Sequence, residues 1–81
     1  MKLITGSQLR AARALLRWSA DDLAAKSKIG VATVRRAEAT DAAPSITEAN
    51  LDTLKRTLEA AGVEFTNGGQ PGVRMKLQPS V

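Results

Sequence analysis

The spacing of apolar residues predicts a helix near the start of the chain. Its apolar positions are Leu9, Ala12, Leu15 and Leu16. They recur every three or four residues, which is the period of an α-helix with one buried face. The preceding run Thr5-Gly-Ser-Gln8 has the pattern of a capping box, in which the first and last side chains bond each other's backbone N–H groups. We therefore expect a first helix from Thr5 to about Arg17.

A second, shorter helix is predicted to begin after Ser19. The hydroxyl of Ser19 can accept a hydrogen bond from a free N–H of the first turn. Asp21 and Asp22 then place negative charge near the positive end of the helix dipole. Its narrow inner face consists of small or apolar residues, Leu23, Ala24 and Ser27.

A third helix is predicted from Gly30 or Val31 to about Ala39. Val34 and Ala37 lie three residues apart and share its inner face. Small residues on the inner faces of both short helices allow them to cross closely. Two short helices joined by a tight turn are typical of a helix-turn-helix unit.

Pro44 prevents the third helix from continuing, so a loop is expected from Thr40 to Ser45. Ser45-Ile-Thr-Glu48 then has the pattern of a second capping box. A long helix is predicted from there to about Ala61, ending at Gly62. Its apolar positions are Leu51, Leu54, Leu58 and Ala61.

The hydrophobic pattern changes to alternation after Gly62. Residues 63–66 and 73–77 alternate apolar with polar side chains, and the glycine-rich segment 67–72 separates them. This pattern predicts a β-hairpin whose apolar face consists of Val63, Phe65, Val73, Met75 and Leu77. Because an isolated hairpin is marginal in water, it needs the helical core or a second copy as a partner surface.

These elements predict a mainly α fold: a small bundle of four to five helices with a C-terminal β-hairpin or strand. We divide the chain into a helix-turn-helix domain at residues 1–62 and a tail at 63–81. The chain of 81 residues has the length of one small domain. It contains no cysteine, which excludes disulfides and thiolate metal sites. No secretory leader is visible, and no apolar run approaches the length of about 20 residues that a membrane span needs. We expect a cytoplasmic protein.

Positive charge is concentrated in the first half of the chain. Twelve Lys and Arg against eight Asp and Glu give a net charge of +4. The basic residues up to position 36 are Lys2, Arg10, Arg13, Arg17, Lys26, Lys28, Arg35 and Arg36, and they face only Asp21 and Asp22. The remainder of the chain is close to neutral. This distribution indicates one face for a polyanion and another for a protein partner.

The run from Leu9 to Glu38, LRAARALLRWSADDLAAKSKIGVATVRRAE, resembles the XRE family of helix-turn-helix regulators, whose archetypes are the lambda and 434 phage repressors. The resemblance continues through Pro44-Ser45 and the amphipathic segment Leu51 to Leu58. It implies a lambda-repressor-like bundle in which the second helix of the motif is the recognition helix. The chain departs from the family pattern at two positions. Lys28 replaces the usual turn glycine and has to adopt a left-handed conformation, and Gly30 replaces the usual Ser or Thr cap.

The resemblance implies that Val31, Ala32 and Arg36 face base edges in the major groove, with Thr33 and Arg35 beside them. Arginine makes the commonest specific base contact, a bidentate pair to guanine. Valine and alanine can contact only thymine methyl groups or read shape. Arg36 is therefore the leading candidate for sequence reading, and Arg35 is the second. The alternative is that both arginines are simply solvated charges.

Candidate phosphate contacts lie at helix N-termini, at the turn and in the following loop. Free N–H groups at a helix N-terminus bind phosphate even without a basic side chain. The candidates are Ser19, Ala20, Lys26, Lys28, Gly30, Thr40 and Ser45. The two lysines have the same alternative as the arginines, solvation alone.

Three further residues are predicted to support the fold. Arg13 and Glu38 match positions that, in the repressor family, form a salt bridge between the first helix and the end of the recognition helix. We interpret this pair as scaffold. Trp18 is predicted to pack on the core, with base stacking as the alternative.

The predicted function is a sequence-specific DNA-binding transcriptional regulator, bacterial or phage, that acts as a homodimer on a (pseudo)palindromic operator. The dimer would use the helix from Thr47 to Ala61, the tail, or both. The candidate partner residues are Leu51, Leu58, Val63, Phe65, Val73 and Met75. The alternative is an antitoxin-like module that binds DNA more weakly and contacts a second regulatory protein. RNA binding is disfavoured because no aromatic platform is present.

Enzymatic function has little support in the sequence. The chain has no histidine, cysteine or tyrosine to serve as a base, nucleophile or metal ligand. Its glycine-rich segment lies in a predicted hairpin rather than at a strand-to-helix junction, where phosphate loops occur. We expect no catalytic residues, no metal, no cofactor and no small-molecule ligand.

Overall fold

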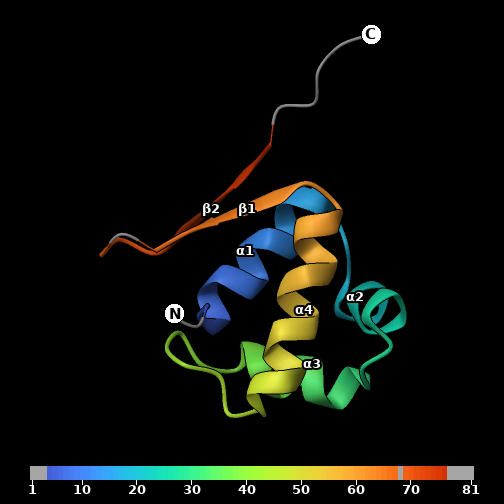
Figure 1. Ribbon diagram of the computed structural model, residues 1–81. Coiled ribbons are helices and arrows are strands. Elements are labelled where there is room, and N and C mark those ends of the chain that lie inside the picture. The colour runs from blue at the N-terminus through green and yellow to red at the C-terminus, as the bar shows by residue number, and fades with distance from the viewer. Residues whose placement is uncertain (1–3, 68, 77–81) are drawn as a thin grey trace, which may run out of the picture.

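The structure is a computed structural model that describes residues 4–67 and 69–76. These residues form four helices followed by an antiparallel hairpin (Figure 1). The elements are α1 (Gly6–Leu16), α2 (Ala20–Ser27), α3 (Val31–Glu38), α4 (Glu48–Ala60), β1 (Val63–Thr66) and β2 (Gly72–Met75). The predicted mainly α fold with a C-terminal hairpin is confirmed. Among the described residues, no helix has both the length and the apolar character needed to cross a membrane.

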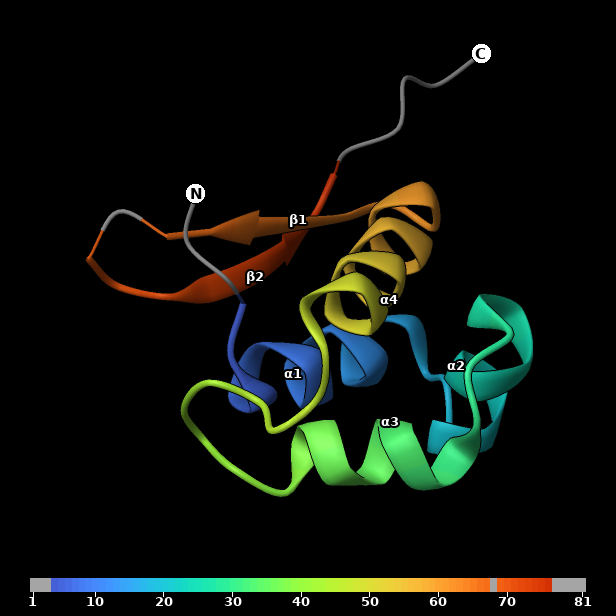
Figure 2. The same ribbon diagram turned by 60° about the horizontal axis from the view of Figure 1, so that its bottom comes forward.

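One apolar core joins all four helices and the hairpin. Its buried side chains are Ile4, Leu9, Ala12, Leu23, Val34, Ala37, Leu51, Leu54, Leu58 and Val63. Helices α1 and α4 lie in the middle of the molecule, with α3 on one side and the hairpin on the opposite side (Figures 1 and 2). Because Val63 belongs to this core, the described part of the tail packs as part of the helical domain.

The first two helices begin where the sequence predicts. Thr5 accepts a hydrogen bond from the backbone N–H of Gln8 at 3.1 Å, and the Gln8 side chain accepts from the N–H of Thr5 at 2.8 Å. Ser19 and Asp22 form the same reciprocal arrangement at the start of α2. Both helices thus satisfy free N–H groups of their first turns with their own side chains.

The predicted start of α4 at Ser45 is wrong by two residues. Thr47 is the N-cap, and its hydroxyl accepts from the backbone N–H of Asn50 at 3.1 Å. Ile46 precedes the cap and packs against the core, to which Leu51 at the fourth helical position also belongs. These two positions match a hydrophobic staple, which favours an extended chain at Ile46 and a cap at Thr47.

The predicted inner face of α1 needs one correction. Leu9 and Ala12 are buried and Leu16 packs against the core, but Leu15 is 43% exposed. Ala11 and Leu15 follow Gln8 by three and seven positions, so Leu15 lies on the same side of the helix as Gln8 and Ala11. Helical period alone cannot say which of two adjacent leucines points at the core.

Left-handed residues end the first two helices. Lys28 has φ 61° and ψ 32°, as predicted, and its backbone N–H bonds the carbonyl of Ala24. Arg17 ends α1 in the same way, with φ 59°. A non-glycine residue pays roughly 1–2 kcal/mol for this conformation. The hydrogen bonds of the two caps offset part of that energy.

The hairpin is fastened to α1 by a buried amide. Gln8 is buried, and its side-chain nitrogen donates to the carbonyls of Thr66 at 3.1 Å and Gly72 at 3.0 Å, one on each strand. In the register, Val63 pairs with Met75 and Phe65 pairs with Val73. These four apolar residues therefore share one face, as predicted, while Leu77 lies outside the described residues.

Burial corrects half of the predicted partner surface. Leu51, Leu58 and Val63 are buried in the core of the single chain and have no surface to offer a partner. Apolar residues at a regular spacing indicate that these side chains are buried. The core of the single chain already buries them. Phe65 and Val73 are half-buried, and Met75 is 42% exposed.

Acid is expected to destabilise the protein in part through Asp22. The hydrogen bond from the backbone of Ser19 holds the pKa of this exposed carboxyl below its ordinary value of 3.8. A group whose pKa is lowered by folding contributes stability above its ordinary pKa and loses it as the pH falls through the lowered value. We expect the thermal midpoint to fall between about pH 5 and pH 2, and to fall less in Asp22→Asn. Asparagine keeps the cap acceptor without the titration, so parallel curves would contradict this role.

Candidate nucleic-acid interface

Helix α3 lies at one edge of the molecule, below α1 and α4 in Figure 2. Val34, Ala37 and Glu38 point inward and are buried. On the outward side, Ala32, Arg35 and Arg36 are exposed, whereas Val31 and Thr33 are half-buried. All five residues predicted to face bases thus retain accessible surface on a single helix.

Arg36 and Thr33 line an open groove between α3 and the start of α4. The groove has a volume of about 450 Å³, and its walls are Thr33, Arg36, Ser45, Ile46, Thr47 and Asn50. The N-terminus of α4 carries N–H groups that no helical carbonyl accepts, which favours an anion there. The groove therefore combines a guanidinium, hydroxyl groups and a helix N-terminus.

The groove brings together some predicted residues and adds others. Ser45 was predicted as a phosphate contact and lies in it beside Arg36, a predicted base contact. Thr47 and Asn50 were not predicted. The signal that would have found them is Thr47 itself, a good N-cap residue whose hydroxyl accepts from the backbone N–H of Asn50 three positions later.

The two arginines of α3 point to different surroundings. The guanidinium of Arg35 lies 4.0 Å from the carboxylate of Asp21 on α2, and both side chains are exposed. Arg36 lines the groove next to α4 instead. This divergence follows from the 100° turn between neighbouring helical residues. It gives Arg36 the position nearest to the other polar groups of the interface.

The remaining phosphate candidates are spread over α2, the turn and the loop. Lys28 and Gly30 lie at the turn before α3, and both are exposed. Lys26 stands over the Trp18 ring, with its Nζ 5.1 Å from the ring centroid. Ala20 is half-buried. Two of the candidates are already engaged within the chain: Ser19 caps α2, and Thr40 accepts a bond from the N–H of Ala42 at 3.1 Å.

Trp18 is half-buried and packs against the hydrophobic core, which confirms its predicted structural role. Its ring also lies beneath the Lys26 ammonium group. An ammonium over an indole face is attracted by the ring quadrupole. The tryptophan therefore helps to hold α2 against the end of α1.

The predicted salt bridge between Arg13 and Glu38 is confirmed. Two parallel hydrogen bonds of 2.7 Å join the guanidinium to the carboxylate, and Glu38 is only 7% exposed. Arg13 also donates to the carbonyl of Trp18 at 3.0 Å. The bond to Glu38 raises the pKa of Arg13 above its ordinary value. This pair fixes the C-terminal end of α3 against α1.

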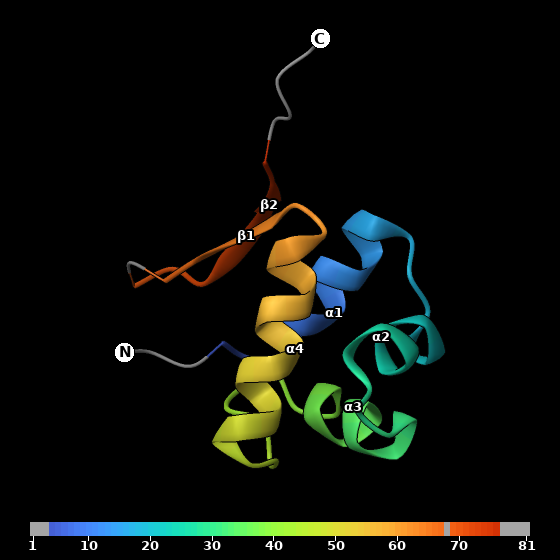
Figure 3. The same ribbon diagram turned by 45° about the vertical axis from the view of Figure 1, so that its right-hand side comes forward.

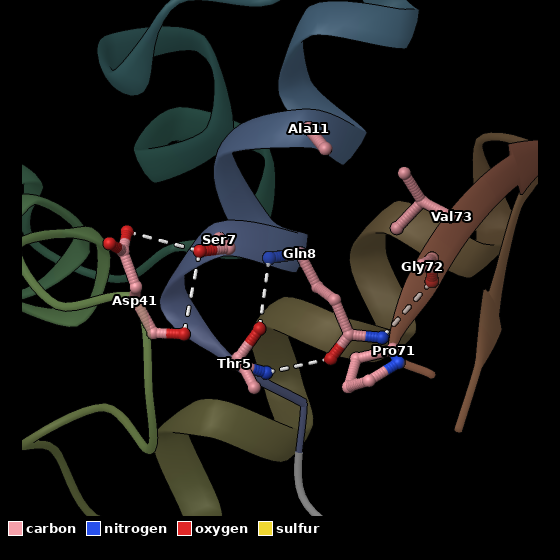
Figure 4. Close-up of a pocket in the computed structure, with 8 residues that line it drawn as sticks. All are labelled: Thr5, Ser7, Gln8, Ala11, Asp41, Pro71, Gly72 and Val73. Atoms are coloured by element: carbon pink, nitrogen blue, oxygen red, sulfur yellow. Dashed lines mark hydrogen bonds between the residues drawn. The ribbon is translucent and has the colours of Figure 1, made fainter. Parts of the chain in front are cut away.

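Arg10 holds the loop that follows α3, a role that the sequence did not reveal. Its guanidinium donates to the carbonyls of Glu38 and Thr40 and to the carboxylate of Asp41. Ser7 donates to the same carboxylate at 3.1 Å. Both bonds lower the pKa of Asp41, with Arg10 as the larger cause. Figure 4 shows Asp41 on the loop beside the first turn of α1, with its carboxylate directed at Ser7.

The backbone of the same loop lies directly on α1. The N–H of Gly6 donates to the carbonyl of Ala42 at 3.0 Å. The loop leads into the groove at Ser45, so α1 sets the position of both walls: α3 through Arg13, and the loop through Arg10 and Gly6. Comparison with known proteins adds nothing to this geometry, because no family model and no curated protein matches the chain.

Proposed function

We propose that the protein is a sequence-specific DNA-binding transcriptional regulator that acts in the cytoplasm as a homodimer on a (pseudo)palindromic operator. The observation that carries the proposal is the exposed face of α3, where Arg36 lies in a groove with Thr33 and the N-terminus of α4. A helix of this kind fits the major groove of B-DNA. The net charge of +4 favours binding to a polyanion.

In this proposal the residues divide into two roles. Arg36 reads a base through bidentate hydrogen bonds, while Val31 and Ala32 provide apolar contact with thymine methyl groups. The hydroxyl proton of Thr47, whose oxygen already accepts from the backbone N–H of Asn50, binds a phosphate beside it together with the Asn50 side chain and the free N–H groups of the first turn of α4. Phosphate contacts fix the register of the protein on DNA, and base contacts supply the specificity. Steric occupation of a promoter is then the simplest mechanism of regulation.

Replacing Arg36 with alanine is expected to weaken operator binding by about 1–3 kcal/mol, which is roughly 5- to 150-fold, and to relax base preference at one position. Binding to random DNA should weaken much less. The measurement is a titration of selected and scrambled duplexes at fixed salt, preceded by selection of bound sequences from random DNA. Because Arg36 is exposed, thermal stability should stay within the range of ordinary surface substitutions.

Arg56→Ala is the matched control, because Arg56 is an arginine on α4 with 78% of its side chain exposed. It removes the same charge from a site outside the groove, and it should leave base preference unchanged. Equal base preferences for Arg36→Ala and the wild type would reject α3 as the reading helix. Equal losses for both arginine variants would reduce the role of Arg36 to bulk charge.

An antitoxin-like module that masks a second protein is the other candidate. The exposed Leu15 and Met75 side chains favour it, because they offer apolar contact away from α3. Removing residues 63–81 is not a clean test, since it deletes Val63 from the core and the hairpin acceptors of Gln8. This candidate would be supported if the protein copurified in a fixed ratio with the product of an adjacent gene and if the Met75→Asp variant did not.

A further inference from the structure

The outer edge of β2 carries backbone groups that no described residue satisfies. Lys76 donates its N–H to the carbonyl of Gly62 at 2.7 Å. Bonded and non-bonded pairs alternate along an antiparallel ladder. The next bonded pair is therefore Glu64 with Arg74, and the N–H and C=O groups of Val73 and Met75 point away from β1. They form an open sheet edge.

A hollow lies beside this edge, between β2 and α1. It has a volume of about 350 Å³ and is lined by Thr5, Ser7, Gln8, Ala11, Asp41, Pro71, Gly72 and Val73. Figure 4 shows Ala11 and Val73 on facing walls, which makes this end of the hollow apolar. Gln8 closes the other wall with its hydrogen bond to Gly72.

The two most exposed large apolar side chains continue the same two walls. Leu15 follows Gln8 and Ala11 along one helical stripe of α1. Met75 follows Val73 on one face of β2. Leu15 is 43% exposed and Met75 is 42% exposed, and they are the large hydrophobic residues that the described part of the chain leaves exposed. The open edge, the hollow and these side chains form one surface, which we call the β2 edge surface.

We infer that the β2 edge surface binds a second copy of this chain, so that two hairpins join into one four-stranded sheet. The inference rests on the proposed function, in which two copies bind a symmetric operator. The register follows from the outward groups: Val73 of each copy pairs with Met75 of the other, and the two Arg74 residues face each other on the symmetry axis. Each of the two bonded pairs exchanges two backbone hydrogen bonds.

This register is self-complementary on the inner face of the sheet. Met75 of the second copy lands opposite Val73, over the apolar end of the hollow beside Ala11. Each row across the four strands then reads Val63, Met75, Val73 and Phe65, without a polar residue. A shift toward the loop would place Met75 opposite Pro71, which has no N–H to donate.

Charge on the outer face is compatible with the same pairing. Arg74 already forms an ion pair with Glu64 of its own strand partner. The two arginines on the axis therefore meet as members of neutral pairs, which reduces the repulsion between directly opposed like charges. A second copy thus pairs the edge N–H and C=O groups, covers the hollow and buries the exposed apolar side chains.

The symmetry also suits DNA. The two-fold axis runs through the sheet toward the helices, and α3 lies on the opposite side of the molecule from the hairpin (Figures 1 and 3). Rotation about this axis therefore leaves both α3 helices on one side of the dimer. Two recognition helices on one face are what a palindromic site requires.

The test uses the absence of cysteine from the chain, so that any disulfide must be intermolecular. Opposed residues of a non-bonded antiparallel pair have Cα atoms about 4.5 Å apart, which a disulfide can bridge. Arg74→Cys should therefore oxidise to a covalent dimer, without DNA, more than roughly tenfold faster than Arg56→Cys. The control position is as exposed, at 78% against 68%. Equal rates would overturn the register and the surface.

A second pair of variants separates the edge from the fold. Met75→Pro removes an N–H that points outward and leaves the ladder to β1 intact, whereas Met75→Leu keeps the N–H and the volume. Sedimentation should show the dimer dissociation constant raised roughly 100-fold in the proline variant and little changed in the leucine variant. Circular dichroism checks that both fold.

The remaining outcomes are also decisive. A folded proline variant that dimerises like the wild type overturns the inference, and so does a wild type that stays monomeric at about 100 μM. In the latter case the edge would be left to another protein. DNA binding is scored separately, because a monomeric Met75→Pro should still bind a single half-site. A Met75→Pro protein that is monomeric but still binds a half-site would support this interface. Loss of DNA binding by a folded wild-type dimer would instead count against the proposed function.

Discussion

Alanine at position 6 is expected to destabilise the fold by about 3 kcal/mol or more, the upper end of the range for overpacked sites. A Cβ on Gly6 would lie 1.9 Å from the carbonyl oxygen of Thr40 and 2.7 Å from that of Ala37. Both are backbone atoms, so no side chain can rotate away. An 81-residue domain has roughly 4–12 kcal/mol of stability in total. The measurement is the urea midpoint at constant m-value.

Gly30→Ala is the control for this prediction. Gly30 has φ −58°, and an added Cβ would meet nothing within 4 Å. We expect a loss of about 1 kcal/mol or less, because Gly30 is the N-cap of α3 and alanine is a poorer N-cap than glycine. If both glycine variants unfolded at the same urea concentration, the close approach of α1 to the end of α3 would be refuted. A Gly6→Ala protein that folds should also bind DNA less well, because the loop to the groove must move.

Arg13→Ala is expected to cost about 3–5 kcal/mol, because it leaves Glu38 buried without a cation. Glu38 is 7% exposed, and the guanidinium supplies both of its short hydrogen bonds. Arg56→Ala removes an exposed pair with Asp52 and should change stability by less than about 1 kcal/mol. Thermal and urea unfolding measure both variants.

A double-mutant cycle tests the cause of that loss. Replacing both Arg13 and Glu38 with apolar residues removes the unpaired charge, so the double variant should be less destabilised than the sum of the single variants. Additive losses would show that the pair is not coupled. DNA binding must be measured at a temperature at which each variant is folded. Otherwise the loss of α3 from its position would be mistaken for the loss of a base contact.

Local signals explain why the helices were predictable. The caps at Thr5 and Ser19 use side chains three residues apart, and the apolar stripes repeat within each helix. Lys28 could be assigned a left-handed conformation because it lies at the turn of a recognisable motif. The pair Arg13 and Glu38 came from resemblance to a family, and the structure shows the contact directly.

The failures share a different cause. Leu15 and Leu16 have the same chemistry, and only the packing of α1 leaves the first exposed. Leu51 and Leu58 were assigned to a partner because an apolar stripe does not say which chain covers it. The cap of α4 is Thr47 rather than the predicted Ser45, because Ile46 packs on the core. The local sequence gives no sign of that packing.

The candidate site was predictable in part for the same reason. The sequence pointed to α3 and to Arg36, since the motif and the charge are both local. It missed Thr47 and Asn50, which become neighbours of Arg36 only when α4 is placed beside α3. The hydrogen bonds from Arg10 to the loop after α3 were also missed, because they join residues about 30 positions apart.

The helices, the hairpin and the positive charge of the first half could be read from the sequence, because hydrogen bonding and burial within each element depend on near neighbours. Which apolar residues stay exposed, which polar groups meet at the groove, and that no described residue pairs with the outer edge of β2 could be learned only from the packed structure. Those properties depend on the relative placement of elements, and the packing of side chains distant in sequence sets that placement.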